Sequence, residues 1–327
     1  MSKFDFAVLG AGAMGSILAA HLARAGHSVA LLARGRRAAQ VRGGGLRITG
    51  LVSHTVPVPV IDDPAQLREA DVLIVATKAI GTAESLRPLA GAKVGCAFSV
   101  QNGVLKNELL QAAFGREHVL GALANLSGEL QPSGEVLFTR NVSLQIGSLA
   151  GGVPDAVRDL ARTIDAAGVR AVAVPDVAAR EWSKFVAWVG MAGVAITTRV
   201  ATWKYLMDPD AALLLVKVIR EMRELAARAG VTLTDESVFP VATLASVADE
   251  EAVRILNAIG AQMREHAPSH RLSAHQDIDA GRPLEVEETL GHAARSAQRE
   301  GLSLPLVDAV YRIAAAIDRT SRAPNFG

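Results

Sequence analysis

The sequence predicts two domains: an α/β domain built on a parallel sheet, then an all-helical domain. Three observations lead to this fold class. The chain begins with a strand, a glycine-rich turn, a helix and a second strand. Further apolar strands follow at regular spacing, and the pattern becomes helical from about residue 178. We expect the boundary near residue 175, which gives domains of residues 1–175 and 176–327.

The composition is that of a folded, nearly neutral protein. Half of the 327 residues are hydrophobic, and 34 Lys and Arg balance 33 Asp and Glu, so we expect no nucleic-acid partner. No apolar run reaches the ~18 residues of a membrane-spanning helix, and the N-terminus lacks a signal-peptide layout. We therefore expect a cytoplasmic protein without a membrane partner. The single Cys96 and the scattered histidines predict no disulfide and no metal site.

The first strand, at about residues 6–9, leads into "GAGAMG", which has the G-x-G-x-x-G spacing. A helix follows at about residues 16–24, Gly26 can end it in the left-handed conformation, and a second strand covers residues 27–33. This arrangement is typical of a Rossmann-type domain, in which the turn and the helix N-terminus bind a pyrophosphate. A flavin is the alternative to a nicotinamide. We expect cofactor contacts along the whole turn: Gly10, Ala11, Gly12, Ala13, Met14 and Gly15.

The end of the second strand selects the cofactor. NAD-binding domains usually place a carboxylate there, about 20 residues beyond the glycines, to hold the ribose 2′-hydroxyl. This chain has Arg34, followed by Gly35, Arg36 and Arg37. A guanidinium binds a 2′-phosphate, whereas a carboxylate repels it. Arg34 therefore favours NADP(H) over NAD(H), unless the stretch is only a solvated basic loop.

Later strands end in polar residues. The segment 54–61 carries prolines and is expected at a sheet edge or as irregular chain, and residues 119–149 are expected as shorter strands that extend the sheet. Two apolar strands end at Lys78 and at Asn102. Ligands bind at the carboxyl ends of parallel strands, so both side chains are candidates for cofactor or substrate contacts. Asn102 with Gly103 can also be a simple turn.

The second half has breaks at prolines and glycines between periodic segments. We expect the substrate in the cleft between the two domains. The predicted helices cover residues 179–197, 210–229, 249–265, 285–300 and 306–319.

The chain resembles the ketopantoate reductase family (2-dehydropantoate 2-reductases and relatives) over nearly its whole length. Four stretches carry the resemblance: "GAGAMGS" with "LARAGHSVALLAR", "VATKA" with "VQNGV", "EWSKF", and "LSAHQDIDAGRPLEVEETLGHAARSAQREGLSLP". The resemblance implies reduction of the ketone of a 2-oxo acid to a 2-hydroxy acid, usually with NADPH, and a possible homodimer. It also implies the fold class predicted above.

The resemblance assigns roles residue by residue. Lys184 matches the general acid, and Asn102 matches an asparagine near the nicotinamide and the substrate. Lys78 matches a lysine near the cofactor, Ser273 a serine that binds the substrate, and Glu285 a glutamate facing the active centre. The chemistry agrees, because hydride attack on a ketone builds alkoxide charge that needs a proton donor. The alternatives are a snorkelling Lys184 and a helix-capping Ser273.

The chain departs from the family pattern four and eight residues after Lys184. Two asparagines that contact the hydroxylated substrate in ketopantoate reductases are replaced by Trp188 and Ala192, which occupy the same helix face. Loss of these groups weakens recognition of a substrate hydroxyl. We expect a bulkier or aromatic 2-oxo acid, unless this face is ordinary core.

Two other functions stay open. One is a 2-hydroxy acid dehydrogenase that uses NAD(P) on a bulkier or aromatic substrate. The other is a catalytically weak NADP-binding sensor, against which the retained Lys184 weighs.

Overall fold

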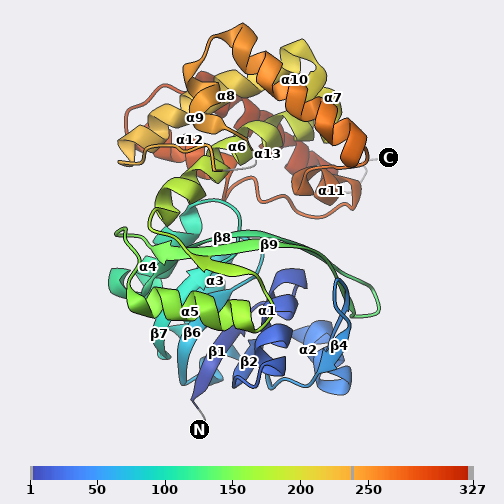
Figure 1. The fold of residues 1–327 in the computed structure, drawn as a ribbon, viewed down its shortest axis with the longest axis vertical. Helices are drawn as coiled ribbons and strands as arrows, with labels where there is room; N and C mark the ends of the chain where they lie inside the picture. The colour runs from blue at the N-terminus through green and yellow to red at the C-terminus, as the bar shows by residue number, and fades with distance from the viewer. Residues whose placement is uncertain (1–2, 237–238, 323–327) are drawn as a thin grey trace. The chain divides into compact units, whose positions relative to one another are not determined.

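The computed structural model describes residues 3–236 and 239–322 (Figure 1). The chain forms two compact units. The first holds the residues up to 102 together with 106–178, and the second holds 103–105 together with the chain from 179 onward. The sequence pattern places the boundary near residue 175 and gives no sign that residues 103–105 join the second unit.

A parallel five-stranded sheet forms the centre of the first unit. Its strands run in the order β5-β2-β1-β6-β7, and each neighbouring pair is parallel. Along β1, Phe6 and Val8 join one apolar cluster, whereas Ala7 and Leu9 join another, so both faces of the sheet are covered. The strands are β1 (Phe4–Leu9), β2 (Val29–Leu32), β5 (Val60–Ile61), β6 (Glu69–Val75) and β7 (Lys93–Ser99).

The strand order reverses at β1, and this reversal fixes where a ligand can bind. Leu9, the last residue of β1, pairs with Leu32 of β2 on one side and with Val75 of β6 on the other. The neighbours of β1 continue the sheet in opposite directions, and in open α/β sheets ligands bind outside the carboxyl ends of the strands at such a point. The glycine-rich turn follows β1 directly and lies at this switch point.

Helix α1 (Ala13–Arg24) begins earlier than the sequence pattern indicates and ends as expected. Gly26, at φ 92°, closes it in the left-handed conformation, with its N–H bonded to Ala23 O at 3.1 Å. The basic stretch after β2 forms a helix, α2 (Gly35–Gly44), not a loop. The other helices that begin in the first unit or at its border are α3 (Thr82–Leu86), α4 (Leu105–Phe114) and α5 (Asp155–Ala166), with 3-10 turns at Pro64–Gln66, Arg87–Leu89 and Arg116–His118.

The expectation that residues 119–149 form shorter strands extending the first sheet is wrong, apart from a single parallel bridge between Val119 and Ala97 of β7. Strands β8 (Leu120–Leu130) and β9 (Val136–Ser148) form one long antiparallel hairpin in a separate sheet. Its turn is closed by Gln131 N–H on Glu135 O at 2.8 Å, with Gly134 at φ 88°. The same sheet contains β3 (Leu46–Gly50), β4 (His54–Val56) and β10 (Ala171–Ala173), in the order β10-β9-β3-β4.

The proline-containing segment 54–61 lies at sheet edges, as predicted. Its first part, β4, is the outermost strand of the second sheet, and its last part, β5, is the outermost strand of the first. Pro57 and Pro59 lie between the two strands. An edge position suits prolines because they cannot donate to a neighbouring strand.

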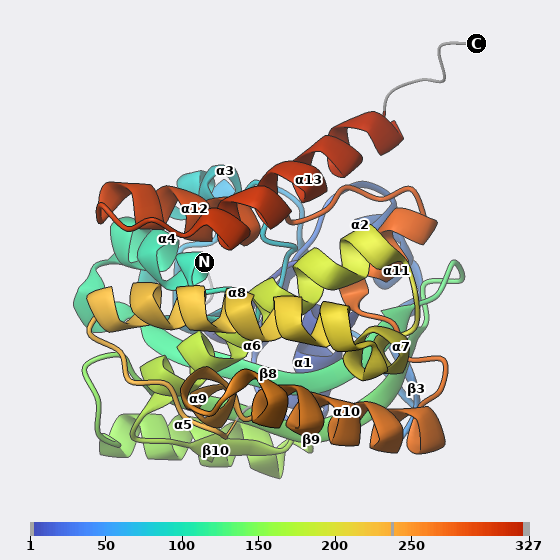
Figure 2. The ribbon, with the colours of Figure 1, turned by 90° about the horizontal axis from the view of Figure 1, so that it is seen from above.

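The second unit, as far as the structure describes it, consists of helices and the turns that join them. Helix α8 packs against α10 on one side and against α12 and α13 on the other (Figure 2). One continuous apolar cluster fills the unit, and α6 supplies many of its members, from Phe185 to Ile196. The helices are α6 (Val177–Thr198), α7 (Thr202–Met207), α8 (Pro209–Arg228), α9 (Val241–Ser246), α10 (Asp249–His266), α11 (Ser273–Asp279), α12 (Leu290–Arg299) and α13 (Pro305–Arg322).

The predicted helix over residues 285–300 is correct only in its second part. Helix α12 begins at Leu290, and residues 286–289 form turns. The hydroxyl of Thr289 donates to Glu285 O, and the N–H of Gly291 reaches back to Val286 O at 2.8 Å. These bonds hold the acidic segment outside the helix.

Two features of residues 3–236 and 239–322 concern membrane and metal binding. None of the helices in those ranges has the length and apolar character needed to cross a bilayer. The same residues contain no grouping of three or more His, Cys, Asp or Glu side chains that could hold a metal ion.

Candidate active site

The three glycines of the turn differ in what a side chain at each position would contact. Gly10 has φ 107°, and a Cβ at this position would lie 2.7 Å from Thr77 N. A Cβ at Gly15 would lie 1.9 Å from Gly10 O. Both glycines are therefore required by the chain's own packing. A Cβ at Gly12 would meet nothing within 4 Å, so no part of this chain needs a glycine there.

The open space at Gly12 suits a ligand that approaches the backbone. Gly12 is the N-cap of α1 and has no side chain that could accept from the first-turn N–H groups. Its carbonyl accepts from Ser16 N at 3.0 Å, which begins the helix. The first-turn N–H groups and the helix dipole favour a bound anion, and the predicted contacts of Ala11, Ala13 and Met14 fall in this turn.

The three arginines after β2 separate into two kinds. Arg36 donates to Pro132 O at 2.7 Å, and Arg37 donates to Ala11 O, Gly134 O and Ser16 Oγ, so both hold the chain's own segments together. The exposed Arg34 side chain has no hydrogen-bond or ion-pair partner within residues 3–236 and 239–322. Arg34 is thus the guanidinium of this stretch that is available to a 2′-phosphate.

Lys78 and Asn102 follow β6 and β7, and their loops are joined by Gln101, which the sequence reasoning missed. The buried Gln101 amide donates to Lys78 O at 2.9 Å and to Thr82 Oγ1 at 2.8 Å, and its Oε1 accepts from Ser99 Oγ at 3.0 Å. Lys78 is exposed and Asn102 is partly buried. An amide has donors and an acceptor, which allows one side chain to fix two loops.

Lys184 lies in the second unit, on α6, and is partly buried. The next residue back, Ser183, is fully buried and anchors this part of the helix. Its hydroxyl donates to Ala179 O at 2.7 Å and accepts from Thr234 N at 2.8 Å. A lysine on an anchored helix that is neither fully exposed nor fully buried suits proton transfer better than a mobile surface lysine.

Trp188 and Ala192 lie one and two turns beyond Lys184 on α6. Trp188 is 7% exposed, and its Nε1–H is buried with no acceptor among the described residues. Leaving such a donor unpaired costs about 1–3 kcal/mol. Ala192 is completely buried and offers no side-chain hydrogen bond.

The acidic segment before α12 contains three glutamates with different surroundings. Glu287 is held by Arg295 Nη1 at 2.8 Å and by the hydroxyl of Tyr311 at 3.0 Å. Burial, together with the charges of Glu285 and Glu287, raises the pKa of Glu288. Glu285 is partly buried. Glu287 is thus held by contacts within the second unit.

Gly103 brings the neighbours of three predicted site residues together. A Cβ on Gly103, at φ 83°, would lie 3.6 Å from Thr289 Cγ2 and 3.8 Å from Phe185 Cε2. Gly103 follows Asn102 and Phe185 follows Lys184. Thr289 closes the turn that begins at Glu285. The three chain segments therefore meet in the second unit. The exposed Ser273 begins α11.

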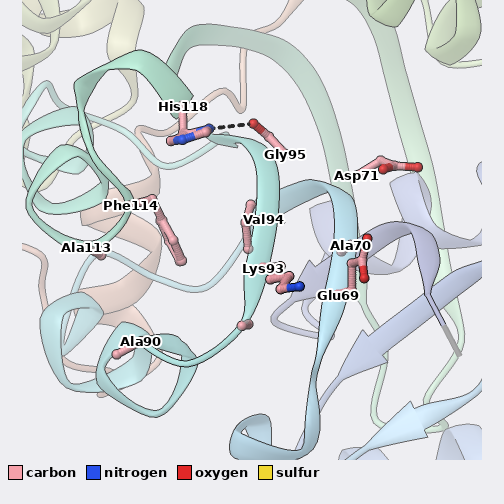
Figure 3. Close-up of a pocket in the computed structure, with 11 residues that line it drawn as sticks. Glu69, Ala70, Asp71, Ala90, Lys93, Val94, Gly95, Ala113, Phe114 and His118 are labelled. Atoms are coloured by element: carbon pink, nitrogen blue, oxygen red, sulfur yellow. Dashed lines mark hydrogen bonds between the residues drawn. The ribbon is translucent and has the colours of Figure 1, made fainter. Parts of the chain in front are cut away.

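A hollow of about 480 Å³ lies at the amino ends of β6 and β7 (Figure 3). Glu69, Asp71, Lys93 and His118 line it, and His118 Nδ1 is 2.8 Å from Gly95 O. None of the predicted site residues lines this hollow. Because the glycine turn lies at the carboxyl ends of the strands, the hollow is not the dinucleotide site.

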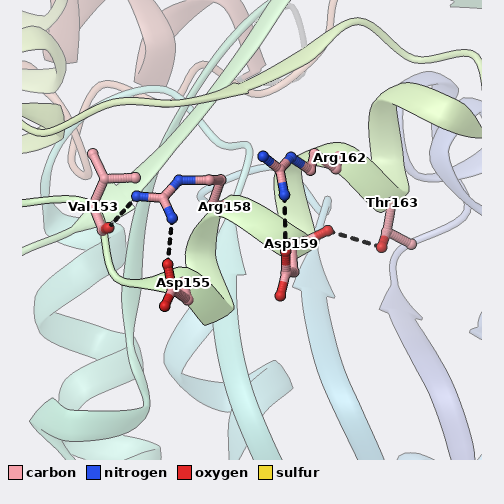
Figure 4. Close-up of polar contacts among 6 residues, drawn as sticks. All are labelled: Val153, Asp155, Arg158, Asp159, Arg162 and Thr163. Atoms are coloured by element: carbon pink, nitrogen blue, oxygen red, sulfur yellow. Dashed lines mark hydrogen bonds and ion pairs between the residues drawn. The ribbon is translucent and has the colours of Figure 1, made fainter.

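A smaller hollow, of about 240 Å³, lies beside α5 and β10. Both arginines that line it contact residues of α5 or the residues just before this helix, as Figure 4 shows. Arg158 pairs with Asp155 and donates to Val153 O at 3.2 Å, and Arg162 lies 3.4 Å from Asp159. Both guanidinium groups are thus paired with carboxylates of α5.

The chain matches known proteins over most of its length. A family model described as ketopantoate reductase PanE/ApbA matches residues 6–151, and the model of the C-terminal part of that family matches residues 176–318. The 2-dehydropantoate 2-reductase of Archaeoglobus fulgidus is 28% identical over 295 residues, 90% of this chain and 91% of that protein.

Solved structures share the fold. The crystal structure of a PanE/ApbA family ketopantoate reductase from Ralstonia eutropha JMP134 superposes with a TM-score of 0.82 at 22% identity, covering 98% of this chain and all of that chain. The ternary structure of D-mandelate dehydrogenase with NADH and anilino(oxo)acetate gives a TM-score of 0.80 at 19% identity, covering 98% and 100%. Identities this low establish the shared architecture, an α/β domain followed by a helical one.

Proposed function

Because this chain belongs to the ketopantoate reductase PanE/ApbA family, we propose that it reduces the ketone of a 2-oxo acid to a 2-hydroxy acid with NADPH. It is an oxidoreductase acting on a CH–OH group, as predicted, and NADP(H) is the cofactor of ketopantoate reductases. The observation that carries the proposal is the glycine turn. Gly10 and Gly15 serve the chain's own packing, whereas Gly12 opens onto space that a pyrophosphate can use.

The residues of the first unit fit NADPH. The N–H groups of residues 12–15 would hold the pyrophosphate, and Arg34 would hold the 2′-phosphate with a charge-assisted bond. Lys78 and Asn102, at the ends of β6 and β7, would contact the cofactor beyond the pyrophosphate. When bound, NADPH supplies a hydride to the carbonyl carbon of the substrate.

The residues of the second unit supply the proton. Hydride addition turns the carbonyl oxygen into an alkoxide, and the ammonium of Lys184 donates a proton to that oxygen, which completes the hydroxyl group. Glu285 is the carboxylate proposed to act beside Lys184, and Ser273 and Asn102 are proposed to bind the substrate. The proximity of Gly103, Phe185 and Thr289 supports these assignments. Gly103 follows Asn102, Phe185 follows Lys184, and the hydroxyl of Thr289 donates to the backbone carbonyl of Glu285.

The test is NADPH oxidation with a panel of 2-oxo acids in the wild type and in Lys184→Ala. We expect Lys184→Ala to lower kcat by about 10²- to 10⁴-fold, the usual contribution of a general acid, and to leave NADPH binding intact. Undiminished turnover would overturn the role of Lys184. Nucleotide binding without turnover on the whole panel would favour the weakly catalytic sensor, and a preference for NAD(H) would favour the NAD-dependent dehydrogenase.

A bulkier or aromatic 2-oxo acid is the substrate class that α6 favours. Trp188 and Ala192 replace the two substrate-binding asparagines of the family, and the Trp188 Nε1–H is buried without an acceptor in the described chain. An aromatic substrate can pack against the small exposed part of Trp188, and loss of the asparagine amides weakens recognition of a substrate hydroxyl. We expect kcat/KM for phenylpyruvate or benzoylformate to exceed that for ketopantoate. A clear preference for ketopantoate would contradict this expectation.

A homodimer and a cytoplasmic location remain predictions. Light scattering of the purified protein at several concentrations measures the first.

A further inference from the structure

The guanidinium of Arg37 joins three separate segments of the first unit. Nε donates to Ala11 O in the glycine turn at 2.9 Å, Nη2 to Ser16 Oγ in α1 at 2.9 Å, and Nη1 to Gly134 O in the β8–β9 turn at 2.7 Å. A planar fork of donors can make such a set of bonds, whereas the point charge of a lysine cannot.

The bonds to Ala11 O fix the direction of a neighbouring amide. The carbonyl accepts from Arg37 Nε and also from Ser16 Oγ at 3.1 Å. In a trans peptide the carbonyl and the following N–H point in opposite directions, so holding Ala11 O fixes the direction of the Gly12 N–H. That N–H belongs to the glycine whose Cα opens onto free space.

Arg37 also brings uncompensated positive charge to the turn. No carboxylate pairs with it in the part of the chain that the structure describes, and its three acceptors are neutral oxygens. Arginine keeps its charge in proteins even where burial lowers the pKa of the guanidinium, as it does for Arg37. The charge adds to the dipole at the N-terminus of α1, and both favour a pyrophosphate.

We propose that Arg37 is a positioning residue for the dinucleotide: it holds the glycine turn in its anion-binding conformation and does not contact the 2′-phosphate. The proposal rests on the proposed function, because it requires that the turn binds NADPH. It separates two arginines that look alike in the sequence. Under this proposal, Arg34 binds the 2′-phosphate, which distinguishes NADPH from NADH. Arg37 supports binding of the pyrophosphate, which both nucleotides contain.

The experiment compares Arg37→Met with Arg34→Met and Arg36→Met. Dissociation constants for NADPH and NADH are measured by fluorescence titration, and kcat is measured at saturating NADPH. We expect Arg37→Met to weaken both nucleotides by the same factor, about 10- to 100-fold, with kcat changed less than about twofold. Arg34→Met should weaken NADPH alone. Arg36→Met, which loses only the bond to Pro132 O, should bind both nucleotides like the wild type.

Two further variants keep the test decisive if Arg37→Met folds poorly in a thermal melt. Ser16→Ala removes one of the two donors to Ala11 O, and Arg37→Lys keeps the charge but loses the fork. Both should weaken NADPH and NADH equally, by less than Arg37→Met.

Three results would overturn the proposal. One is unchanged binding in Arg37→Met or, where that variant does not fold, in Ser16→Ala and Arg37→Lys. Another is loss of NADPH binding alone, which would make Arg37 a reader of the 2′-phosphate. The third is a wild type that binds neither nucleotide, which would overturn the proposed function as well.

Discussion

At the scale of single residues, the glycine turn separates what the fold needs from what a ligand needs. A motif of three glycines predicts a tight turn, but the letters alone do not tell which glycine serves which purpose. The structure does, because a side chain at Gly15 would collide with Gly10 O, whereas one at Gly12 would enter open space.

This difference predicts opposite effects of the same substitution. Gly12→Ala should change the melting temperature little, since its Cβ meets nothing, but should weaken NADPH binding at least tenfold by obstructing the backbone's approach to the pyrophosphate. Gly15→Ala should destabilise the protein by several kcal/mol or prevent folding, since backbone must move. Thermal melts and NADPH titrations of both variants measure this. Equal losses of stability would contradict it.

The roles of some other residues could not be predicted from the sequence. The proposed roles of Arg34, Lys78 and Asn102 rest on their positions after strands, which the periodicity of the sequence reveals. Arg37 and Gln101 act through contacts with Gly134 O and Thr82 Oγ1, whose sequence distance from them is large. No local pattern encodes such pairings. The sequence therefore predicts only that the stretch at residues 34–37 is basic and that the strand before Asn102 ends in polar residues.

At the scale of elements, strong periodicity predicted well and turns predicted poorly. The apolar strands of the first sheet and the long helices α6, α8 and α10 were found because burial repeats along them. The β8–β9 hairpin was missed although "QPSG" is a plausible turn, because its strands belong to a second sheet, in which β9 also pairs with β3 and β10, both distant in the sequence. The acidic stretch before Leu290 has helical spacing but is held in turns by Thr289.

Helix α12 carries a pH-dependent contribution to stability. Burial, then the charges of Arg299 and Arg295, lowers the pKa of His292 to about 4, from 6.5. The folded state therefore keeps this histidine neutral, while the unfolded chain takes up a proton below pH 6.5. The contribution of His292 to the free energy of unfolding is fully present above about pH 6.5. It is lost as the pH falls toward 4, and the loss is roughly 3 kcal/mol at most.

The measurement is the free energy of unfolding in urea between pH 4 and 7, for the wild type and His292→Asn. His21 and His54, whose pKa values burial also lowers, titrate in both proteins, so the difference between the two curves isolates His292. We expect the variant to lose less stability than the wild type as the pH falls. Parallel curves would show that His292 is not protonated differently in the folded and unfolded states.

At the scale of the whole molecule, the cofactor should stabilise the protein by mass action. A ligand at 100 times its dissociation constant adds about 2.7 kcal/mol to the free energy of unfolding if it binds only the folded state. NADPH should therefore raise the melting temperature more than NADH at the same concentration, and Arg34→Met should abolish that difference. Equal shifts in the wild type would contradict the assignment of the 2′-phosphate to Arg34.

The excursion of residues 103–105 into the second unit limits how members of this family can exchange parts. Val104, 5% exposed, belongs to the apolar cluster of the helical unit, although the 73 residues 106–178 of the other unit follow before the chain returns to it. A chimera spliced once, near residue 178, would place one parent's residue 104 in the other parent's core. Recombination that preserves the packing needs three junctions, so the two halves of this protein must change together.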